Sequence, residues 1–288
     1  MNHGMLKCAE HYWPAKNLHL RDWTNYASIL KAFLSSAAKD GDVAMIKLMA
    51  KRGYVKMMRH LGALAGRTGI LGWLDRRQDR RGLHWLRSLF AIYDVDQMIA
   101  LDVPWWTYRA IDAVDQYLQA HPNAAVFEFG SGASTVWLAR RAGTVHSVEH
   151  DKDWFDLMQS RIAPYPSITL THVPADAVRC DDPLYRSQKE AYLGRSFQNY
   201  VKTIADTGQT YDLIVIDGRA RQACLHVAQT CLAKGGMIVF DNTKRTRYDA
   251  AIRKSDFVAT HFSGMTPSLP YPDKTTLLRH GQTSGRNA

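Results

Sequence analysis

Residues 124–135 read AAVFEFGSGAST, and residues 136–140 continue as VWLAR. The apolar run before Gly130 is rich in branched and aromatic residues and predicts a buried strand, whereas the apolar spacing after Thr135 suits a helix. Glycine tolerates positive φ and has no side chain, so a Gly-Ser-Gly turn between a strand and a helix lets backbone N–H groups approach a ligand closely. The stretch therefore predicts a ligand-binding turn, with an acid, Glu128, just before it.

Strand-like and helix-like segments alternate from residue 124 onward. Continuous apolar strands such as residues 213–216 (LIVI) are typical of strands buried on both faces, and their alternation with helices predicts an α/β fold with a parallel sheet between two helical layers. Residues 263–274 are rich in Pro and Gly and too irregular for a covering helix, so the last two strands are predicted to pair antiparallel at the sheet edge. The predicted strands are 124–129, 144–149, 168–173, 212–217, 236–241, 257–262 and 275–280. The predicted helices between them are 134–142, 152–162, 197–206, 219–233 and 246–254.

The first hundred residues are mainly helical in pattern and carry most of the chain's excess positive charge of +10. Between Lys51 and Phe90, ten Lys or Arg residues face two Asp residues. Such a segment attracts nucleic acid, anionic lipid or acidic substrates, but a solvated helical face has the same composition. Nucleic acid is not the expected partner, because aromatic residues are not interleaved with the charges. Four glycines in this segment predict short helices and turns rather than one long helix. They are Gly62, Gly66, Gly69 and Gly72.

We predict two parts: a basic helical N-terminal region, residues 1–100, and a second domain, residues 101–288. The N-terminal helices offer a surface for a homodimer. No run approaches the roughly 18 apolar residues that cross a bilayer, and residues 1–10 lack the apolar core of a signal peptide, so we expect a cytoplasmic protein without a transmembrane segment. The four cysteines have no metal or redox spacing and are predicted to be buried thiols. They are Cys8, Cys180, Cys224 and Cys231.

Glu149 ends the second predicted strand, nineteen residues beyond Gly130. Nicotinamide-binding domains and S-adenosylmethionine-dependent methyltransferases both use a glycine turn after the first strand and such an acid on ribose hydroxyls. Other features separate the two. Glu128 could hold a methionine amino group but would be out of place beside a pyrophosphate, and Thr135 stands where a dinucleotide fingerprint has its third glycine. The terminal hairpin also favours the methyltransferase family.

Over residues 101–288 the chain resembles class I S-adenosylmethionine-dependent methyltransferases. The matching motifs are Glu128–Gly132 after the first strand, Val148–His150 after the second, Ala175–Ala177 after the third, Asp212–Gly218 at the fourth and Gly235–Asn242 at the fifth. The resemblance implies a Rossmann-like seven-stranded, mostly parallel sheet with an antiparallel terminal strand, and S-adenosylmethionine as cofactor. It places the glycine turn on the methionine part, Glu149 on the ribose and Asp176 near the adenine; a helix cap is the alternative for Asp176. The implied cofactor-binding residues are Glu128, Gly130, Ser131, Gly132, Ser134, Thr135, Glu149, His150, Asp176, Ala177 and Asp217.

The ends of the fourth and fifth strands also resemble those of metal-dependent O-methyltransferases of the catechol and caffeoyl-coenzyme A type. That resemblance implies Asp217, Asp241 and Asn242 as catalytic residues and as ligands of Mg²⁺, which prefers hard oxygen donors and lowers the pKa of a bound hydroxyl. An Asp after the fourth strand also lines the cofactor pocket in methyltransferases without a metal, so both possibilities stay open. The sequence departs from the catechol type at Ala220, where that type has a lysine base.

Basic residues follow the same two strands, at the edge where an open α/β sheet binds its ligands. Arg219, Arg221 and Lys244 are candidates for binding an anionic substrate, because guanidinium groups bind carboxylate and phosphate well. Tyr192 lies in a long insert between the third and fourth strands, where a lid over the substrate is one possibility and plain covering of the sheet is the other.

The expected function is methyl transfer from S-adenosylmethionine to an oxygen, or less readily a nitrogen, of a small molecule, with Mg²⁺ as a candidate helper. An alternative from another class is a catalytically silent protein of the same fold that uses its basic N-terminal region on nucleic acid or a membrane surface. A nicotinamide oxidoreductase is disfavoured by Glu128.

Overall fold

The computed structural model of the chain describes residues 40–177, 182–187 and 192–281. The chain divides into two compact units, residues 1–92 and residues 93–288. The division lies a few residues before the boundary that the sequence suggested. Helix α6 (Val95–Ala100) belongs to the second unit because it packs against helix α8 (Ala133–Ala139) there.

The described part of the first unit is helical. Its elements are α3 (Asp40–Arg67), α4 (Ile70–Asp75) and α5 (Arg81–Leu89). The prediction that glycines break this segment into short helices is wrong at Gly62 and Gly66, through which α3 runs unbroken, but the chain does break at Gly69, which has a φ of +78° and is followed by the short helices α4 and α5. One glycine costs a helix only about 1 kcal/mol, so two of them do not end a helix of 28 residues.

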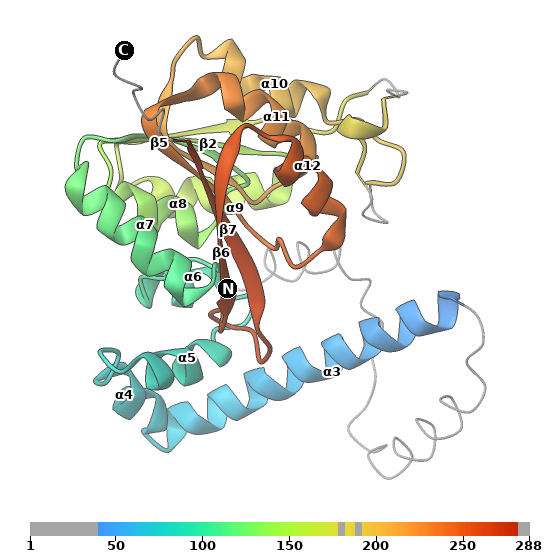
Figure 1. Ribbon diagram of the computed structural model, residues 1–288. Helices are drawn as coiled ribbons and strands as arrows, with labels where there is room; N and C mark the ends of the chain where they lie inside the picture. The colour runs from blue at the N-terminus through green and yellow to red at the C-terminus, as the bar shows by residue number, and fades with distance from the viewer. Residues whose placement is uncertain (1–39, 178–181, 188–191, 282–288) are drawn as a thin grey trace. The chain divides into compact units, whose positions relative to one another are not determined.

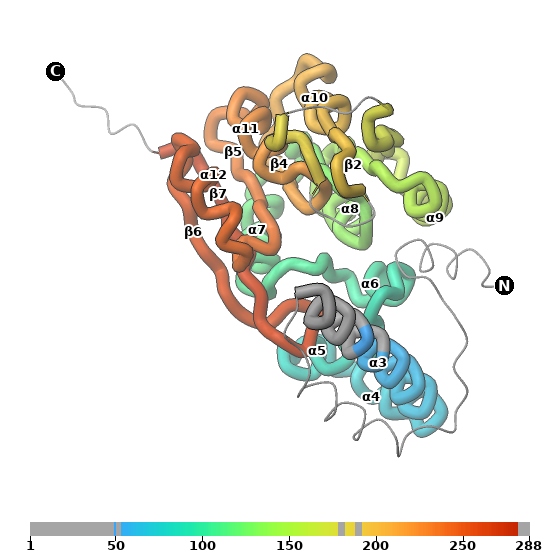
Figure 2. Tube along the Cα trace, turned by 90° about the vertical axis from the view of Figure 1, so that its right-hand side faces the viewer, coloured from blue at the N-terminus to red at the C-terminus, as the bar shows by residue number. Residues whose placement is uncertain are grey.

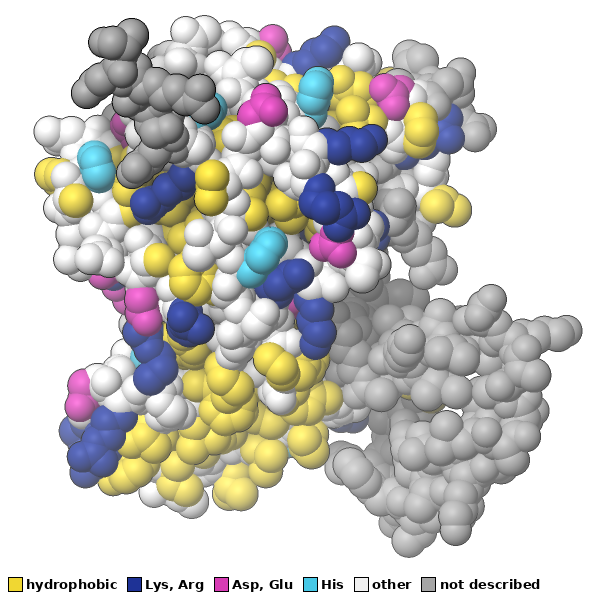
Figure 3. Space-filling model, in the orientation of Figure 1, with side chains coloured by type: hydrophobic (Ala, Val, Ile, Leu, Met, Phe, Trp, Pro, Cys, Tyr) yellow, Lys and Arg dark blue, Asp and Glu magenta, His cyan; other side chains and the backbone are white. Residues whose placement is uncertain are grey.

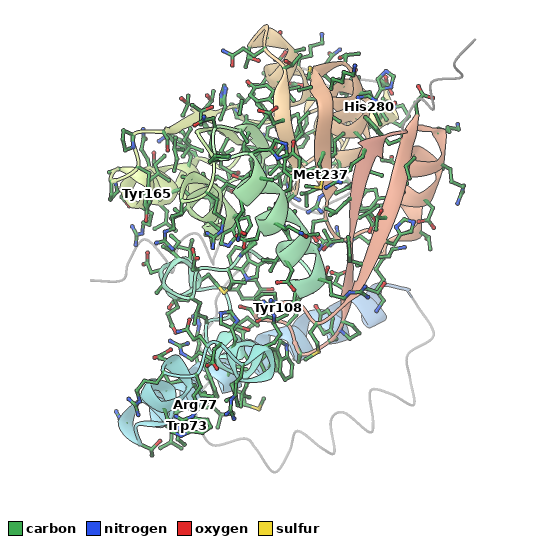
Figure 4. The ribbon with its side chains drawn as sticks, turned by 60° about the vertical axis from the view of Figure 1, so that its left-hand side comes forward. Trp73, Arg77, Tyr108, Tyr165, Met237 and His280 are labelled. Carbon is green, nitrogen blue, oxygen red and sulfur yellow. The ribbon has the colours of Figure 1, made fainter. Side chains whose placement is uncertain are left out.

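A small apolar cluster holds the first unit together, formed by Met58, Leu89 and Ile92. Seven of the twelve large apolar side chains that are exposed in the described residues lie in this unit, and Figure 3 shows hydrophobic side chains gathered on its surface. The guanidinium of Arg77 covers one of them, with its Cζ 4.4 Å from the ring centre of Trp73 (Figure 4). No described helix is long and apolar enough to cross a membrane.

The second unit is built on a seven-stranded sheet in the order β3-β2-β1-β4-β5-β7-β6 (Figure 1). The strands are β1 (Ala125–Phe129), β2 (Thr144–Glu149), β3 (Ile168–His172), β4 (Tyr211–Ile216), β5 (Leu232–Phe240), β6 (Phe257–Gly264) and β7 (Asp273–His280). The first five strands pair parallel, and β7 pairs antiparallel with both β5 and β6. The long β6–β7 hairpin lies along one edge in Figure 2. The predicted fold class, including the antiparallel end of the sheet, is confirmed.

Strand β5 begins earlier than the sequence predicted. Its pairing with β4 jumps from Tyr211–Leu232 to Leu213–Met237, so a bulge lies between the two pairs. At Gly236 a Cβ would lie 2.8 Å from the carbonyl oxygen of Asp212, which shows how closely the two backbones approach there. Helix α11 (Arg221–Cys231) consequently ends two residues before its predicted end.

Helices cover both faces of the sheet (Figure 1). One layer holds α10 (Gln198–Asp206) and α11, with α12 (Asp249–Lys254) beside α11; the other holds α7 (Tyr108–Ala120), α8 and α9 (Lys152–Ile162). An apolar core of the described residues lies between the sheet and the α10–α11 layer. Cys224 and Cys231 are free, buried thiols within it, as predicted, whereas Cys8 and Cys180 lie outside the described residues.

Candidate active site

The glycine turn is held from below by Glu128, whose side chain is fully buried. Its two carboxylate oxygens accept hydrogen bonds from the hydroxyls of Ser134, Thr135 and Ser147. Ser134 and Thr135 begin helix α8 and Ser147 lies on β2, so one acid ties the turn to the helix and to the neighbouring strand. Glu128 thus holds the turn together through protein hydroxyls, and its expected contact with an amino group of the cofactor stays a prediction.

Burial raises the pKa of Glu128 to about 7, although the three hydroxyls partly oppose the shift. The unfolded chain loses this proton near the ordinary value of 4.5, whereas the folded protein keeps it to about pH 7. The stability that the protonated acid contributes is therefore complete below the unfolded value and is lost as the pH rises through the folded one.

Glu128→Gln should remove this pH dependence, because a neutral amide replaces an acid that folding prefers to keep neutral. Relative to wild type, the variant's free energy of unfolding should rise by an amount on the order of 3 kcal/mol between pH 5 and pH 8. Urea unfolding across this range measures the difference. The exposed carboxylate of Asp153, changed to Asn, is the control and should show no such trend. If the free energy of unfolding of the variant differed from that of wild type by the same amount at every pH, the raised pKa assigned to Glu128 would be contradicted.

Two glycines meet where the sheet order reverses, between β1 and β4. Gly130 has a φ of +98°, and a Cβ on it would lie 3.0 Å from the Cα of Gly218. A Cβ on Gly218 would lie 2.9 Å from the carbonyl oxygen of Phe129. Backbone without side chains therefore forms the carboxyl edge of the sheet between β1 and β4. This place, where the strand order reverses, is the switch point of the sheet, and open α/β sheets bind their ligands there.

Glu149 lies beside this edge, 3% exposed, at the end of β2. One oxygen accepts hydrogen bonds from the backbone N–H and the hydroxyl of Ser131, both at 3.1 Å, and the other accepts from the backbone N–H groups of His150 and Asp151. These donors and His150 lower the pKa of Glu149 in spite of its burial. The carboxylate is therefore held ionised, as an acceptor for hydroxyl groups requires.

A cluster of ring and guanidinium groups adjoins Glu149. Nε of Arg219 donates to Nε2 of His150 at 2.9 Å, which puts the imidazole proton on Nδ1, 2.7 Å from a Glu149 oxygen. The ring of Tyr192 lies 5.1 Å from His150 and 5.5 Å from the Arg219 guanidinium, and its hydroxyl donates to Asp151. The structure thus brings together four residues that the sequence predicted separately for cofactor or substrate.

Asp176 caps a helix in this structure. Its carboxylate accepts hydrogen bonds from the Ser196 hydroxyl and from the backbone N–H groups of Gln198 and Asn199, in the first turn of α10. This is the alternative role left open by the sequence. Ala177 is exposed and is the last described residue before residues 178–181.

Asp217 and Asp241 end β4 and β5, and Arg221 joins the two ends. The side chain of Asp217 is 23% exposed, and one of its oxygens accepts from Arg221 at 2.6 Å. Asp241 is buried, and its oxygens accept from the Thr275 hydroxyl at 2.8 Å and from the Asn242 amide at 2.6 Å. Burial raises the pKa of both acids, that of Asp241 to about 8, with the charge of Asp217 adding to the shift.

The predicted magnesium ligands do not fit a metal ion as they stand. The guanidinium of Arg221 occupies Asp217, and Asn242 turns its amide nitrogen, not its oxygen, toward Asp241 and Asp273. No group of three or more His, Cys, Asp or Glu side chains suited to a metal is found within the described ranges.

The predicted substrate-binding residues differ in how far their side chains are exposed to solvent. Arg221 is buried, 8% exposed, and its guanidinium nitrogens all donate to oxygen atoms of Asp217, Gly218 and Asp241, so it is not placed to meet a substrate; this corrects the prediction. Arg219 is partly exposed, and Lys244 is exposed with its ammonium 3.3 Å from the carbonyl oxygen of Pro272. Exposed Arg245 is a further cation, and it lies close enough to Asp217 for its charge to oppose the rise in the pKa of that acid.

Aromatic residues at the turn were missed from the sequence. Trp105 lies against Gly132, since a Cβ there would be 3.5 Å from its ring, and the indole of Trp154 donates to the carbonyl oxygen of Ser131 at 2.9 Å. Tyr200 is fully buried beneath Gly218. The Trp-Trp pair at 105–106 was the available signal for the first, but nothing local marks the other two.

Comparison with known families assigns this region. Residues 127–243 match the family model described as a methyltransferase domain. No curated protein gives a significant match to the sequence.

Solved structures share the fold at low sequence identity. A methyltransferase-like protein from Silicibacter pomeroyi is 21% identical, covers 59% of this chain and 86% of its own, and has a TM-score of 0.42. The O-methyltransferase TomG from Streptomyces achromogenes, solved with SAM, is 16% identical, with 64% and 90% coverage and a TM-score of 0.45. A putative caffeoyl-CoA O-methyltransferase from Staphylococcus aureus is 10% identical, with 65% and 90% coverage and a TM-score of 0.43.

Proposed function

We propose that the chain carries a class I S-adenosylmethionine-dependent methyltransferase domain and that it methylates an oxygen atom of a small, anionic molecule. The match of residues 127–243 to a methyltransferase domain supports the first part. One observation carries the proposal. The bare glycine edge at the β1–β4 switch point lies beside an ionised, buried acid, Glu149, so the edge offers close backbone approach and a hydroxyl acceptor together.

The residues present fit the cofactor. Gly130 and Gly218 let the ends of β1 and β4 approach closely with no side chain between them, and Glu149 beside them is ionised and tied to the glycine turn through Ser131. When bound, S-adenosylmethionine supplies an electrophilic methyl group on a sulfonium. The chain's own part is to hold the turn through Glu128, to orient the ribose through Glu149 and to position the acceptor.

Asp217 is our candidate for the acceptor's proton, in preference to Asp241 and Asn242. Its side chain is partly exposed, whereas both oxygens of Asp241 are occupied and buried. Burial raises the pKa of Asp217, which moves a carboxylate toward the range useful for a general base. Two residues are the candidates for binding an anionic group on the acceptor. One is Arg219, whose guanidinium lies beside His150 and Tyr192, and the other is exposed Lys244.

Glu149→Gln tests the cofactor site. A carboxylate that accepts hydrogen bonds from ligand hydroxyls contributes more than an amide, so S-adenosylhomocysteine should bind about 10- to 100-fold more weakly to the variant. Calorimetric titration measures the affinity, and transfer of a labelled methyl group measures the activity. Asp153→Asn, on an exposed surface two residues into the α9 turn, is the matched control and should bind as wild type does.

The outcomes separate the parts of the proposal. Unchanged affinity in the Glu149 variant would remove that acid from the cofactor site, and no binding by the folded wild type would sink the function. Hydroxylated carboxylic acids should be methylated faster than their uncharged amides; equal rates would remove Arg219 and Lys244 from the acceptor site. The cytoplasmic location, the homodimer and the silent-binding alternative stay predictions.

A further inference from the structure

Arg221 is the first residue of α11, and its guanidinium sits where the carboxyl ends of β4 and β5 meet. All three guanidinium nitrogens donate to oxygen atoms of these two strand ends. The acceptors are the carbonyl oxygens of Gly218 at 3.1 Å, Asp241 at 2.7 Å and Asp217 at 2.8 Å, and the carboxylate of Asp217 at 2.6 Å. The side chain is only 8% exposed, so the charge belongs to the interior of the edge.

Four oxygens that converge on one buried point resemble the donor set of a hard cation. Two acids share this neighbourhood, and their mutual repulsion contributes to the raised pKa of Asp241. An uncompensated pair of buried carboxylates is costly, so the edge needs a positive charge. The guanidinium supplies that charge and satisfies the carbonyl oxygens at the same time.

No other described cation is placed to do this. Arg219 directs its Nε at His150, and Arg245 is exposed to solvent. The charges of both residues partly oppose the rise in the pKa of Asp217. The hydrogen bonds to the strand-end carbonyl oxygens, however, come from Arg221.

We propose that Arg221 is a permanent, built-in cation at the place where the resemblance to catechol-type enzymes expects a divalent metal ion, and that it excludes such an ion from this edge. The metal-exclusion claim stands on the contacts alone; the claim that methyl transfer needs no divalent metal rests in addition on the proposed function. Arg221 is a positioning residue, because it holds the strand ends and Asp217 and does not itself meet the acceptor.

The test asks whether removing the guanidinium creates a metal site. Wild type, Arg221→Met and the double variant Arg221→Met with Asp241→Asn are titrated with Mn²⁺ and followed by electron paramagnetic resonance of the free ion. Wild type should bind no Mn²⁺ saturably at this edge. Arg221→Met should gain one saturable site, and the double variant should lose it. About 1 mM Mn²⁺ should raise the melting temperature of Arg221→Met by a few degrees without changing that of wild type.

Arg245→Met is the matched control, since it removes a neighbouring exposed arginine and should not create a site. A saturable Mn²⁺ site in wild type that Asp241→Asn abolishes would overturn the proposal, and so would an Arg221→Met protein that folds but binds no metal. Where Arg221→Met does not fold, the wild-type titration still decides, and Arg221→Lys, which keeps the charge, should fold and exclude Mn²⁺.

Binding of S-adenosylhomocysteine to wild type in the presence of a chelator separates the two claims. If wild type binds S-adenosylhomocysteine in the presence of the chelator and has no manganese site, both metal exclusion and metal-independent function are supported. If it binds no S-adenosylhomocysteine in any condition, the proposed function is contradicted, but metal exclusion stays supported. Methyl transfer that stops with chelator and returns with Mg²⁺ would overturn metal independence.

Discussion

Arg221→Met is expected to lower the free energy of unfolding by about 3–5 kcal/mol at pH 8, because it removes one partner from a buried group of charges. Methionine fills a similar volume, so little of the loss should come from a cavity. The carboxylates of Asp217 and Asp241 then lose the cation that stabilises both of them most, and three carbonyl oxygens lose their donor. Urea unfolding at several pH values measures the effect.

The sign of its pH dependence follows from the raised pKa values. Asp241 keeps its proton to about pH 8 in the folded protein and loses it near the ordinary value of 3.8 when unfolded, so its contribution to stability falls as the pH rises through that window. Without Arg221 this fall should become steeper, since the variant lacks the cation that does most to stabilise the ionised forms. The deficit against wild type should therefore be small at pH 5 and largest above pH 8.

Arg253→Met is the control for this series, because Arg253 is exposed on α12 and should change stability by no more than about 0.5 kcal/mol. A deficit of equal size at pH 5 and pH 9 would show that Arg221 stabilises by packing and not by charge.

Gly218→Ala is expected to cost about 3 kcal/mol of stability and to weaken S-adenosylhomocysteine binding by more than about tenfold. The new Cβ would overlap the hydroxyl of Tyr200 and lie 2.9 Å from the carbonyl oxygen of Phe129. Tyr200 cannot swing aside easily, because it is fully buried against Phe129 and Phe197. The strand ends must separate instead, and they carry the glycine edge to which we assign the cofactor. Thermal or urea unfolding and calorimetric titration measure the two effects.

A second substitution identifies the clash. Tyr200→Phe removes the nearest atom, so the double variant should recover at least about 1 kcal/mol relative to the sum of the single effects. Gly82→Ala is the control, because Gly82 lies in α5 with no atom within 4 Å of its Cβ position, and it should be stabilising by about 0.5–1 kcal/mol. Additive effects of the Gly218 and Tyr200 changes would contradict the proposed contact.

Much of the second unit could be predicted from the sequence because its signals are local. Helix α9 has the predicted bounds, residues 152–162, since Asp151 caps it by accepting from the backbone N–H of Trp154. The buried strands were readable from continuous apolar runs, and the irregular segment before β7 correctly indicated an antiparallel end. Local signals failed for β5, where a bulge shifts the pairing with β4, and for α3, which is long enough to continue through Gly62 and Gly66.

For the site, the sequence by itself determined which residues stand at the strand ends, because the spacing of strands, turns and helices depends on backbone geometry and apolar period. Only the tertiary structure decided which of them can meet a ligand. Glu128, Asp176 and Arg221 are all charged residues at predicted site positions, yet each one is bonded to protein groups. Their partners lie on other elements or in the folded turn, and burial makes those bonds compulsory, since an unpaired polar group away from water costs more than any local preference can supply.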